Sequence, residues 1–172
     1  MTKHWDGTES LAFVFDDGGR SNSGYRGRAG DCVARSVAIA SGKAYSEVYA
    51  ALSGGAEHER KSRGASARNG IHTTRKWFKD YMRSIGFVWT PTMHIGQGCK
   101  VHLLRGELPA GRLVVALSKH YTAVIDGVIH DTYDPTRATL YPDDKGRAGG
   151  GYGRMAHRCV YGYWKLLRLD AA

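Results

Sequence analysis

Three residue types that together can form an activated thiol nucleophile occur at widely separated positions in this sequence. Cys32 follows the stretch GRAGD and opens VARSVAIA, a segment for which we expect a helix that ends at Gly42. A thiol in the first helical turn faces unpaired backbone N–H groups and the positive end of the helix dipole, which stabilise the nucleophilic thiolate. The neighbouring carboxylate of Asp31 opposes this charge, and a buried cysteine can also be a simple core residue.

His120 can serve as the base that such a thiol needs. It follows the apolar run GRLVVALSK and begins the stretch HYTAVIDGVIHDTY. Asp126-Gly127, placed between alternating apolar residues, predicts a two-residue β-hairpin turn. A catalytic base also needs a third group that fixes its tautomer, and the predicted turn determines which residue can take that role.

The register of this hairpin selects Asp131 as the partner of His120. With the turn at residues 126–127, Thr122 faces Asp131, and His120 becomes the diagonal neighbour of Asp131 on the same face. His130 and Asp134 then point to the opposite face. A slip of one residue would exchange Asp131 for His130 or Asp134, so the assignment depends on the turn.

The remaining patterns predict an α+β domain, with helices first and antiparallel strands afterwards. We expect helices at YSEVYAAL (45–52) and TTRKWFKDYMRSIG (73–86), the latter capped by Thr73 and carrying a core face of aromatic and apolar residues. Strands are expected at LAFVF (11–15), FVWTPTM (87–93, ending at Pro91), GRLVVAL (111–117), the hairpin just described and RCVYGYWKLL (158–167).

Composition indicates a single globular domain spanning residues 1–172. Hydrophobic residues make up 42% and charged residues 24% of the chain, and no apolar run approaches the ~20 residues of a membrane helix. The N-terminal sequence does not resemble a secretory signal. Three cysteines, Cys32, Cys99 and Cys159, make an odd and small set, which favours free thiols in a reducing compartment. We therefore expect a soluble, cytoplasmic protein.

The net charge of +9 favours an acidic partner. Two glycine-bearing regions, 54–70 and 141–158, each hold four Lys/Arg against two acidic residues. We expect both to be solvated loops rather than a shaped basic groove, so a protein or peptide partner is favoured over nucleic acid. Oligomeric state cannot be read from these features.

Other candidate sites carry weaker signals. Cys99-x2-His102 and His157-x-Cys159 supply zinc-ligand types, but neither spacing is usual for structural zinc. The run GRAGGGYGR lacks the strand-to-helix context and the Lys-Ser/Thr of a phosphate-binding loop. The prediction is therefore no metal and no cofactor.

Along the chain, a cysteine begins an early helix, a histidine lies on a later strand, and an acid lies on the strand after that. This order resembles that of the papain-like cysteine peptidase superfamily. The segment IHDTYD (129–134) is similar to the papain-like stretch in which an orienting asparagine precedes Ser-Trp, with Asp131 at the asparagine position. GDCVARSVAIASGKAYSEVYAAL, HYTAVIDGVIHDTYDP and RCVYGYW also resemble small proteins of bacteriophages and other mobile bacterial elements. The resemblance covers roughly residues 24–53 and 111–165. It implies a papain-like fold, with N-terminal helices on a C-terminal antiparallel sheet, and a thiolate–imidazolium pair.

The oxyanion hole departs from the papain-like pattern. Those peptidases carry a glutamine shortly before the nucleophile, whereas here Arg26 stands six residues before Cys32, and the nearest upstream amide side chain is Asn22. The backbone N–H of Cys32 can supply one donor. Asn22, Arg26 or another backbone amide can supply the second.

Two functional hypotheses remain. The first is a cysteine hydrolase, most simply a thiol peptidase, with Cys32 attacking an amide or (thio)ester carbonyl, His120 as general base and acid, and Asp131 orienting it. Deamidases and acyl transferases use the same pair. The second is a catalytically inactive phage-type binding protein whose basic loops engage a host protein or nucleic acid. The first predicts a Cys32 sulfur within about 3–4.5 Å of a His120 ring nitrogen.

Overall fold

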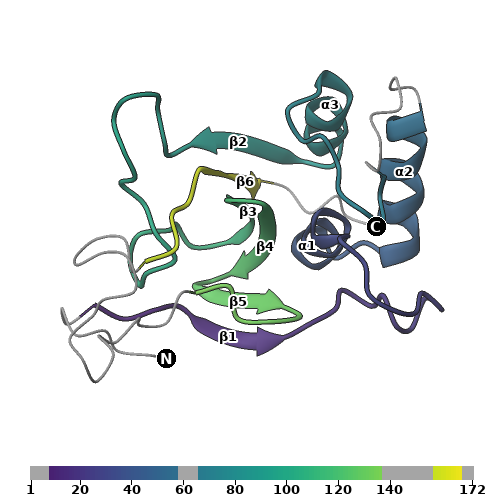
Figure 1. The fold of residues 1–172 in the computed structure, drawn as a ribbon, viewed down its shortest axis with the longest axis horizontal. Helices are drawn as coiled ribbons and strands as arrows, with labels where there is room; N and C mark the ends of the chain where they lie inside the picture. The colour runs from purple at the N-terminus through teal and green to yellow at the C-terminus, as the bar shows by residue number, and fades with distance from the viewer. Residues whose placement is uncertain (1–7, 58–65, 137–156, 168–172) are drawn as a thin grey trace, which may run out of the picture.

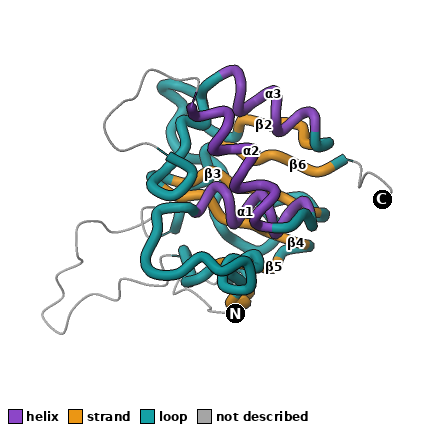
Figure 2. Tube along the Cα trace, turned by 90° about the vertical axis from the view of Figure 1, so that its right-hand side faces the viewer, coloured by secondary structure: helices purple, strands orange, loops and turns teal. Residues whose placement is uncertain are grey.

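Alternating apolar residues in the second half of the chain build the centre of a six-stranded sheet, and three helices lie on one side of it (Figures 1 and 2). The structure, a computed structural model, describes residues 8–57, 66–136 and 157–167. The helices are α1 (Cys32–Ser41), α2 (Tyr45–Glu57) and α3 (Lys76–Ser84). The strands are β1 (Ala12–Phe15), β2 (Phe87–Pro91), β3 (Arg112–Leu117), β4 (His120–Ile125), β5 (Val128–Asp131) and β6 (Gly162–Leu166). The fold class is α+β, as predicted.

The strand order is β1-β5-β4-β3-β6-β2, and one pairing differs from the expected antiparallel sheet. The four pairings from β5 to β2 are antiparallel, but β1 lies parallel to β5. The prediction of a purely C-terminal antiparallel sheet is therefore wrong at this edge. Parallel neighbours need a long crossover, and the chain between β1 and β5 contains all three helices, which supply one.

Helix α1 is held at its C-terminal end by two contacts. Gly42 adopts the left-handed conformation that favours glycine (φ 75°), and its N–H donates to the Ala38 carbonyl, so the helix ends where the sequence predicted. Arg112 of β3 donates from Nε to the Ala40 carbonyl at 2.7 Å and from Nη2 to the Ile39 carbonyl at 2.6 Å. These bonds satisfy carbonyls that a helix end leaves unpaired and tie α1 to the sheet.

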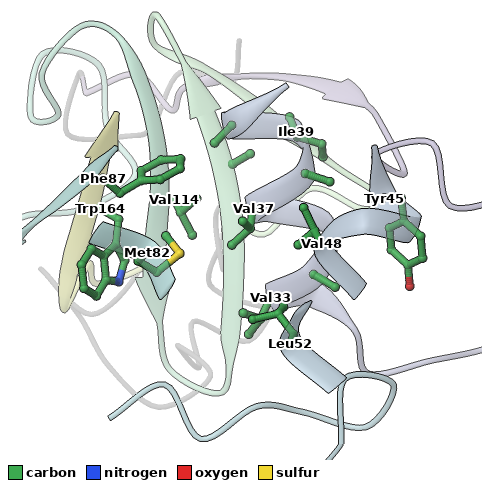
Figure 3. Packing of buried hydrophobic residues seen from close by; sticks show 14 of the residues in the cluster. Val33, Val37, Ile39, Tyr45, Val48, Leu52, Met82, Phe87, Val114 and Trp164 are labelled. Carbon is green, nitrogen blue, oxygen red and sulfur yellow. The ribbon is translucent and has the colours of Figure 1, made fainter. Parts of the chain in front are cut away.

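The two faces of the sheet carry separate hydrophobic clusters, as the alternation of side chains along a strand requires. One cluster fills the space between the helices and the sheet; Figure 3 labels its members Val33, Val37, Ile39, Tyr45, Val48, Leu52, Met82, Phe87, Val114 and Trp164. The other covers the opposite face and comprises Leu11, Leu103, Leu113, Val115, Leu117, Val124, Ile129 and Val160. In β3, Val114 thus faces the helices, while Leu113 and Val115 face away from them.

Helix α2 is longer than predicted and occupies part of an expected loop. It runs to Glu57, so residues 54–57 are helical, and residues 66–70 form a short bridged turn. Gly55 is required there because a Cβ at this position would lie 2.3 Å from Cε3 of Trp77, which packs across the helix. The rest of the first predicted loop (58–65) and most of the second (141–156) lie outside the described residues.

Helix α3 begins later than the sequence predicted. Its N-cap residue is Arg75 rather than Thr73, and no side chain caps it. The Thr73 hydroxyl instead accepts a hydrogen bond from the Tyr121 hydroxyl at 2.8 Å, which links this segment to β4. The predicted core face of the helix is confirmed, with Phe78 and Met82 fully buried.

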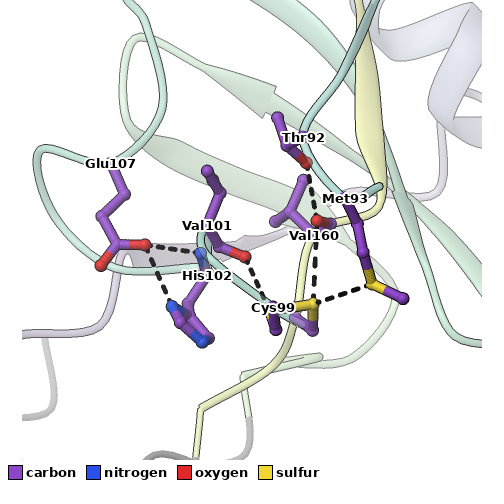
Figure 4. The surroundings of a disulfide bond; sticks show 8 residues. Thr92, Met93, Cys99, Val101, His102, Glu107 and Val160 are labelled. Carbon is purple, nitrogen blue, oxygen red and sulfur yellow. Dashed lines mark hydrogen bonds and ion pairs between the residues drawn. A yellow bond between two sulfur atoms is a disulfide. The ribbon is translucent and has the colours of Figure 1, made fainter. Parts of the chain in front are cut away.

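The expectation of three free thiols is wrong. Cys99 and Cys159 form a disulfide that joins the segment after β2 to the segment before β6, and Cys32 is the one free cysteine (Figure 4). Sequence spacing gave no sign of this bond, since 60 residues separate the two cysteines. The thiol-based inference of a reducing, cytoplasmic compartment loses its support and stays a prediction. Among the described residues, no helix is long and apolar enough to cross a membrane.

Candidate active site

The β4–β5 hairpin brings His120 and Asp131 together as predicted. Asp126 and Gly127 both have positive φ angles (48° and 79°), which is the geometry of a type I′ turn. His120 is the first residue of β4 and Asp131 the last of β5, so both lie at the same end of these strands. His120 Nε2 and Asp131 Oδ2 are 2.7 Å apart, and the two residues are only 6% and 3% exposed.

The alternative registers are not adopted. Ala123 pairs with His130 and Ile125 with Val128, which is the predicted alignment. His130 points to the other face of the sheet, where its Nδ1 lies 3.2 Å from Asp16 Oδ2. Asp16 follows β1, the strand that the sequence did not place beside β5. The carboxylate that faces His120 is therefore that of Asp131.

Cys32 belongs to helix α1, whereas His120 and Asp131 belong to the β4–β5 hairpin. As the first residue of α1, it lies where that helix, packed against β4, reaches the end of the hairpin. Burial lowers the pKa of the His120 ring, but hydrogen bonds to Asp131 and Cys32, and the negative charges of these groups, outweigh burial and raise the pKa to about 9. Since Asp131 occupies Nε2, the ring nitrogen left for the thiol is Nδ1. The imidazole therefore lies between a carboxylate and the thiol.

Asp31 does not oppose a thiolate at Cys32 in the way that its position in the sequence suggested. Its carboxylate makes no capping bond to α1; it forms ion pairs with Arg20 Nε (2.9 Å) and Arg35 Nη1, and it accepts the Tyr45 hydroxyl at 2.5 Å. Two guanidinium groups thus more than neutralise this buried carboxylate. The first-turn N–H groups of α1 remain uncapped by the Asp31 side chain, so they can face negative charge at Cys32.

Two further residues border the histidine. The Tyr133 ring lies 4.9 Å from the His120 ring, centroid to centroid. Burial, followed by the charge of Asp131, raises the pKa of Tyr133. Lys119, directly before His120, has a φ of 55°, an uncommon conformation for a residue other than glycine. Such strain is found where a tight connection must aim a functional side chain.

Cys32 and His120 open into a cleft of about 750 Å³. One wall is aromatic and includes Trp89, Tyr121, Tyr133 and Tyr161. Other parts of the lining come from the segment before α1, from residues 69–74 and from the β3–β4 turn; they include Ala29, Gly30, Asn69, Ile71, Thr73 and Lys119. A cleft of this volume is in the usual range for binding sites of small molecules and peptide segments.

The oxyanion-hole candidates Asn22 and Arg26 lie away from this cleft. Both are exposed, and neither lines it. The turn just before them is closed by the Asp17 carboxylate, which accepts from Gly19 N–H (2.9 Å) and Ser21 N–H (2.9 Å), and Arg20 of this turn reaches Asp31. The prediction for these two side chains is therefore wrong, whereas the Cys32 backbone N–H does lie at the start of α1.

Asn69 is a cleft residue that the sequence did not single out. It lines the cleft from the turn at residues 66–70, and its backbone packs against Gly30, where an added Cβ would lie 3.5 Å from Asn69. Because Gly30 is two residues before Cys32, this packing places Asn69 near the segment that leads to Cys32. Asn69 is distant from Cys32 in sequence, so no spacing pattern indicated it.

The four residues considered as zinc ligands do converge in the structure. His102 pairs with Cys159 through an isolated β-bridge, and the rings of His102 and His157 are 5.9 Å apart. However, Cys99 and Cys159 are bonded to each other, and His102 Nδ1 lies 3.2 Å from Glu107 Oε2 (Figure 4). In the described part of the chain, no group of three or more His, Cys, Asp or Glu side chains is arranged to hold a metal ion.

No family model, curated protein or solved structure matches this chain.

Proposed function

We propose that this protein is a cysteine hydrolase of papain-like type, most simply a thiol peptidase. The observation that supports it best is the position of His120, which is hydrogen-bonded to Asp131 through Nε2 and lines the same cleft as Cys32. A nucleophile, a base and an orienting acid in this arrangement form the general pattern of covalent acyl-transfer catalysis.

The chemistry follows from these positions. The Cys32 thiolate attacks the substrate carbonyl carbon, forming a C–S bond, and the carbonyl oxygen becomes an oxyanion. As the C–N bond breaks, the imidazolium of His120 donates its proton to the leaving amine. Water then attacks the thioester, His120 accepts a proton from that water, and the thiolate leaves. Asp131 holds the ring in the required tautomer throughout.

The oxyanion requires two donors, and the cleft offers candidates for both. The backbone N–H of Cys32 belongs to the uncapped first turn of α1. The Asn69 side chain, which lines the same cleft, takes the role proposed earlier for Asn22 or Arg26. Removing one such donor in well-studied acyl-transfer enzymes costs about 10²–10³-fold in turnover. Asn69→Ala should accordingly lower kcat far more than it raises KM.

Reactivity of the Cys32 thiol tests the proposal directly. Because Cys99 and Cys159 are bonded to each other, intact mass measures alkylation of a single thiol. Iodoacetamide at pH 6 should alkylate Cys32 at least tenfold faster than it alkylates glutathione, since an ion pair with His120 keeps the thiolate populated. His120→Ala should abolish that difference, while the surface variant His94→Ala, exposed and outside the cleft, should keep it.

Hydrolysis is tested with a pooled library of quenched fluorogenic peptides. The wild type should cleave a subset that Cys32→Ala leaves intact, with unchanged melting temperature, because alanine is favourable in a helix. Alkylation of Cys32 no faster than that of glutathione, together with no cleavage, would instead favour the inactive binding protein. A deamidase or acyl transferase would show fast alkylation without peptide cleavage.

A further inference from the structure

A second cavity adjoins the cleft that contains Cys32. It has a volume of about 680 Å³ and shares Ala29, Arg35 and Tyr133 with the first. Its remaining lining consists of Phe15, Asp17, Arg20, Gly27, Arg28 and Thr132. Because the two cavities share these lining residues, they are neighbours, and we call them the first and the second chamber. The nucleophile lies in the first chamber and three arginines line the second.

Arg35 is a buried cation at the junction of the chambers. It is 8% exposed and lies one helical turn after Cys32 in α1. Its Nη1 pairs with Asp31, but its buried Nε has no hydrogen-bond partner among the described residues. A guanidinium group carries five N–H donors. Arg35 therefore borders both cavities and has a donor that no described residue uses, and a buried polar group of this kind requires a partner.

Arg28 adds an unpaired charge to the second chamber. Its side chain is exposed, and no hydrogen bond or ion pair joins it to another described residue. The carboxylates nearby are already engaged: Asp31 by Arg20 and Arg35, and Asp17 by backbone N–H groups of its own turn. The hydrogen bonds to Asp17 outweigh the effect of its burial and lower its pKa, so it stays ionised. Among the charged side chains that line the second chamber, together with the Asp31 partner of its arginines, three guanidinium groups stand against two carboxylates, which leaves one positive charge in excess.

We propose that the second chamber binds a carboxylate of the substrate, so that the enzyme acts on an amide bond close to an acidic group. This inference rests on the proposed function and names its substrate class. The matching chemistry is a single negative charge with two acceptor oxygens, which suits the planar donors of Arg28 and Arg35. The aromatic residues that line the first chamber can accommodate an apolar group of the substrate. The carboxylate can come from a Glu or Asp side chain or from a chain terminus.

Three small alkylating probes distinguish these sources. N-bromoacetyl-glutamate amide carries a side-chain carboxylate, N-bromoacetyl-glutamine carries a terminal carboxylate, and N-bromoacetyl-glutamine amide is neutral. In each reaction the Cys32 thiolate attacks the methylene carbon, a C–S bond forms and bromide leaves. For each charged probe, the rate with Cys32 is divided by the rate of the neutral probe, and this ratio is divided by the same ratio measured with glutathione. At low salt, we expect the corrected ratio to be about ten for one of the charged probes, as charge-assisted hydrogen bonds imply. The faster probe identifies the source.

The ratio of rates separates this proposal from the proposed function. If Cys32 is not activated, it reacts slowly with all three probes alike and the ratio is unchanged. A high ratio with slow alkylation would therefore contradict only the proposed hydrolase function. A ratio near one with fast alkylation would contradict only the carboxylate site. Because the attraction is electrostatic and partly exposed, the ratio should fall as salt is raised.

Substitution of Arg28 locates the site. Arg28→Gln should bring the ratio close to one, while Arg26→Gln, the same charge change in the same segment but outside both chambers, should keep it. Both side chains are exposed, so neither variant should alter the melting temperature. A preference that survives in Arg28→Gln, or that disappears in Lys119→Gln, would overturn the assignment to the second chamber.

Discussion

At the scale of single residues, the main consequence of the geometry is that His120 carries a proton well above neutral pH. Its pKa is raised to about 9 from the ordinary 6.5 because Asp131 and Cys32 outweigh the opposing effect of burial. A histidine in this state is already protonated at neutral pH, so it cannot act as a base there. In the proposed mechanism, its role at that pH is to donate a proton to the leaving group.

This protonation state predicts the alkaline limit of activity. Above about pH 9, His120 loses the proton that the leaving amine needs, so kcat/KM should fall tenfold per pH unit. Alkylation of Cys32 should not fall, because the thiolate persists without the proton. The two profiles should be measured on the same protein from pH 5 to 10.5. A parallel fall of both would show that His120 does not act as the acid.

The same shift links folding to pH. Because the folded pKa of His120 is higher than that of the unfolded chain, its stabilising effect is fully present below about pH 6.5. It is then lost as pH rises through about 9. Urea unfolding of the wild type should show this loss, and His120→Ala should lack it. Equal pH dependence in the two proteins would contradict the assigned pKa.

Asp131 should act through His120 alone. Asp131→Asn keeps an acceptor for the ring N–H and should lower kcat/KM about tenfold, whereas Asp131→Ala removes it and should cost on the order of 100-fold, within the range of general acid–base effects. The pKa of His120, followed by its ring NMR signals, should fall in both variants because a negative charge is lost. Equal activity of the two variants would show that orientation by a hydrogen bond is unimportant.

At the scale of elements, the nucleophile helix is fixed at both ends. The ion pairs of Asp31 with Arg20 and Arg35 hold its start, and the bonds from Arg112 hold its end. Arg20 comes from the turn after β1, and Arg112 from β3. Cys32 therefore owes its place beside His120 to contacts from two distant parts of the chain, in addition to the packing of α1 on the sheet.

Loss of Asp31 should be among the most damaging substitutions. Asp31→Ala leaves two buried arginines without their counter-charge, and breaking a buried ion pair from one side costs about 3–5 kcal/mol. Tyr45→Phe removes one hydrogen bond to the same carboxylate and should cost only about 1 kcal/mol, which makes it the matched control. The free energy of unfolding in urea measures both. Similar small losses would show that the ion pairs are solvated.

The sequence predicted the local features of the site and missed the long-range ones. The hairpin register followed from Asp126-Gly127, because a two-residue turn and alternating side chains leave little freedom. The start of α1 at Cys32 followed from its flanking residues in the same way. In contrast, the partners of Asp31, the parallel placement of β1 and the approach of Asn69 to Gly30 depend on tertiary packing. No periodicity in a single sequence records such contacts.

At the scale of the whole molecule, the two faces of the sheet are covered by different means. Helices cover one face, whereas the cluster on the other face is closed by the segments around residues 101–104 and 158–160. These segments pair through Val160 N–H to the Val101 carbonyl (2.8 Å) and Leu103 N–H to the Arg158 carbonyl (3.1 Å). The Cys99–Cys159 bond joins them covalently beside these hydrogen bonds (Figure 4).

Reduction of this disulfide should therefore loosen the cover of the second cluster and lower stability substantially. A crosslink between residues 60 apart restricts the unfolded chain enough to stabilise the fold by about 3–4 kcal/mol. Urea unfolding with and without a phosphine reductant should show that loss in the wild type and in Cys32→Ser. The double variant Cys99→Ser/Cys159→Ser should have the same free energy of unfolding as the reduced wild type, and the reductant should not change it.

Because Cys32 and His120 are held by α1 and the β4–β5 hairpin, reduction of the disulfide at urea concentrations below the unfolding midpoint should leave the Cys32 alkylation rate unchanged. A wild type whose stability is the same with and without reductant would show that the bond does not form in solution.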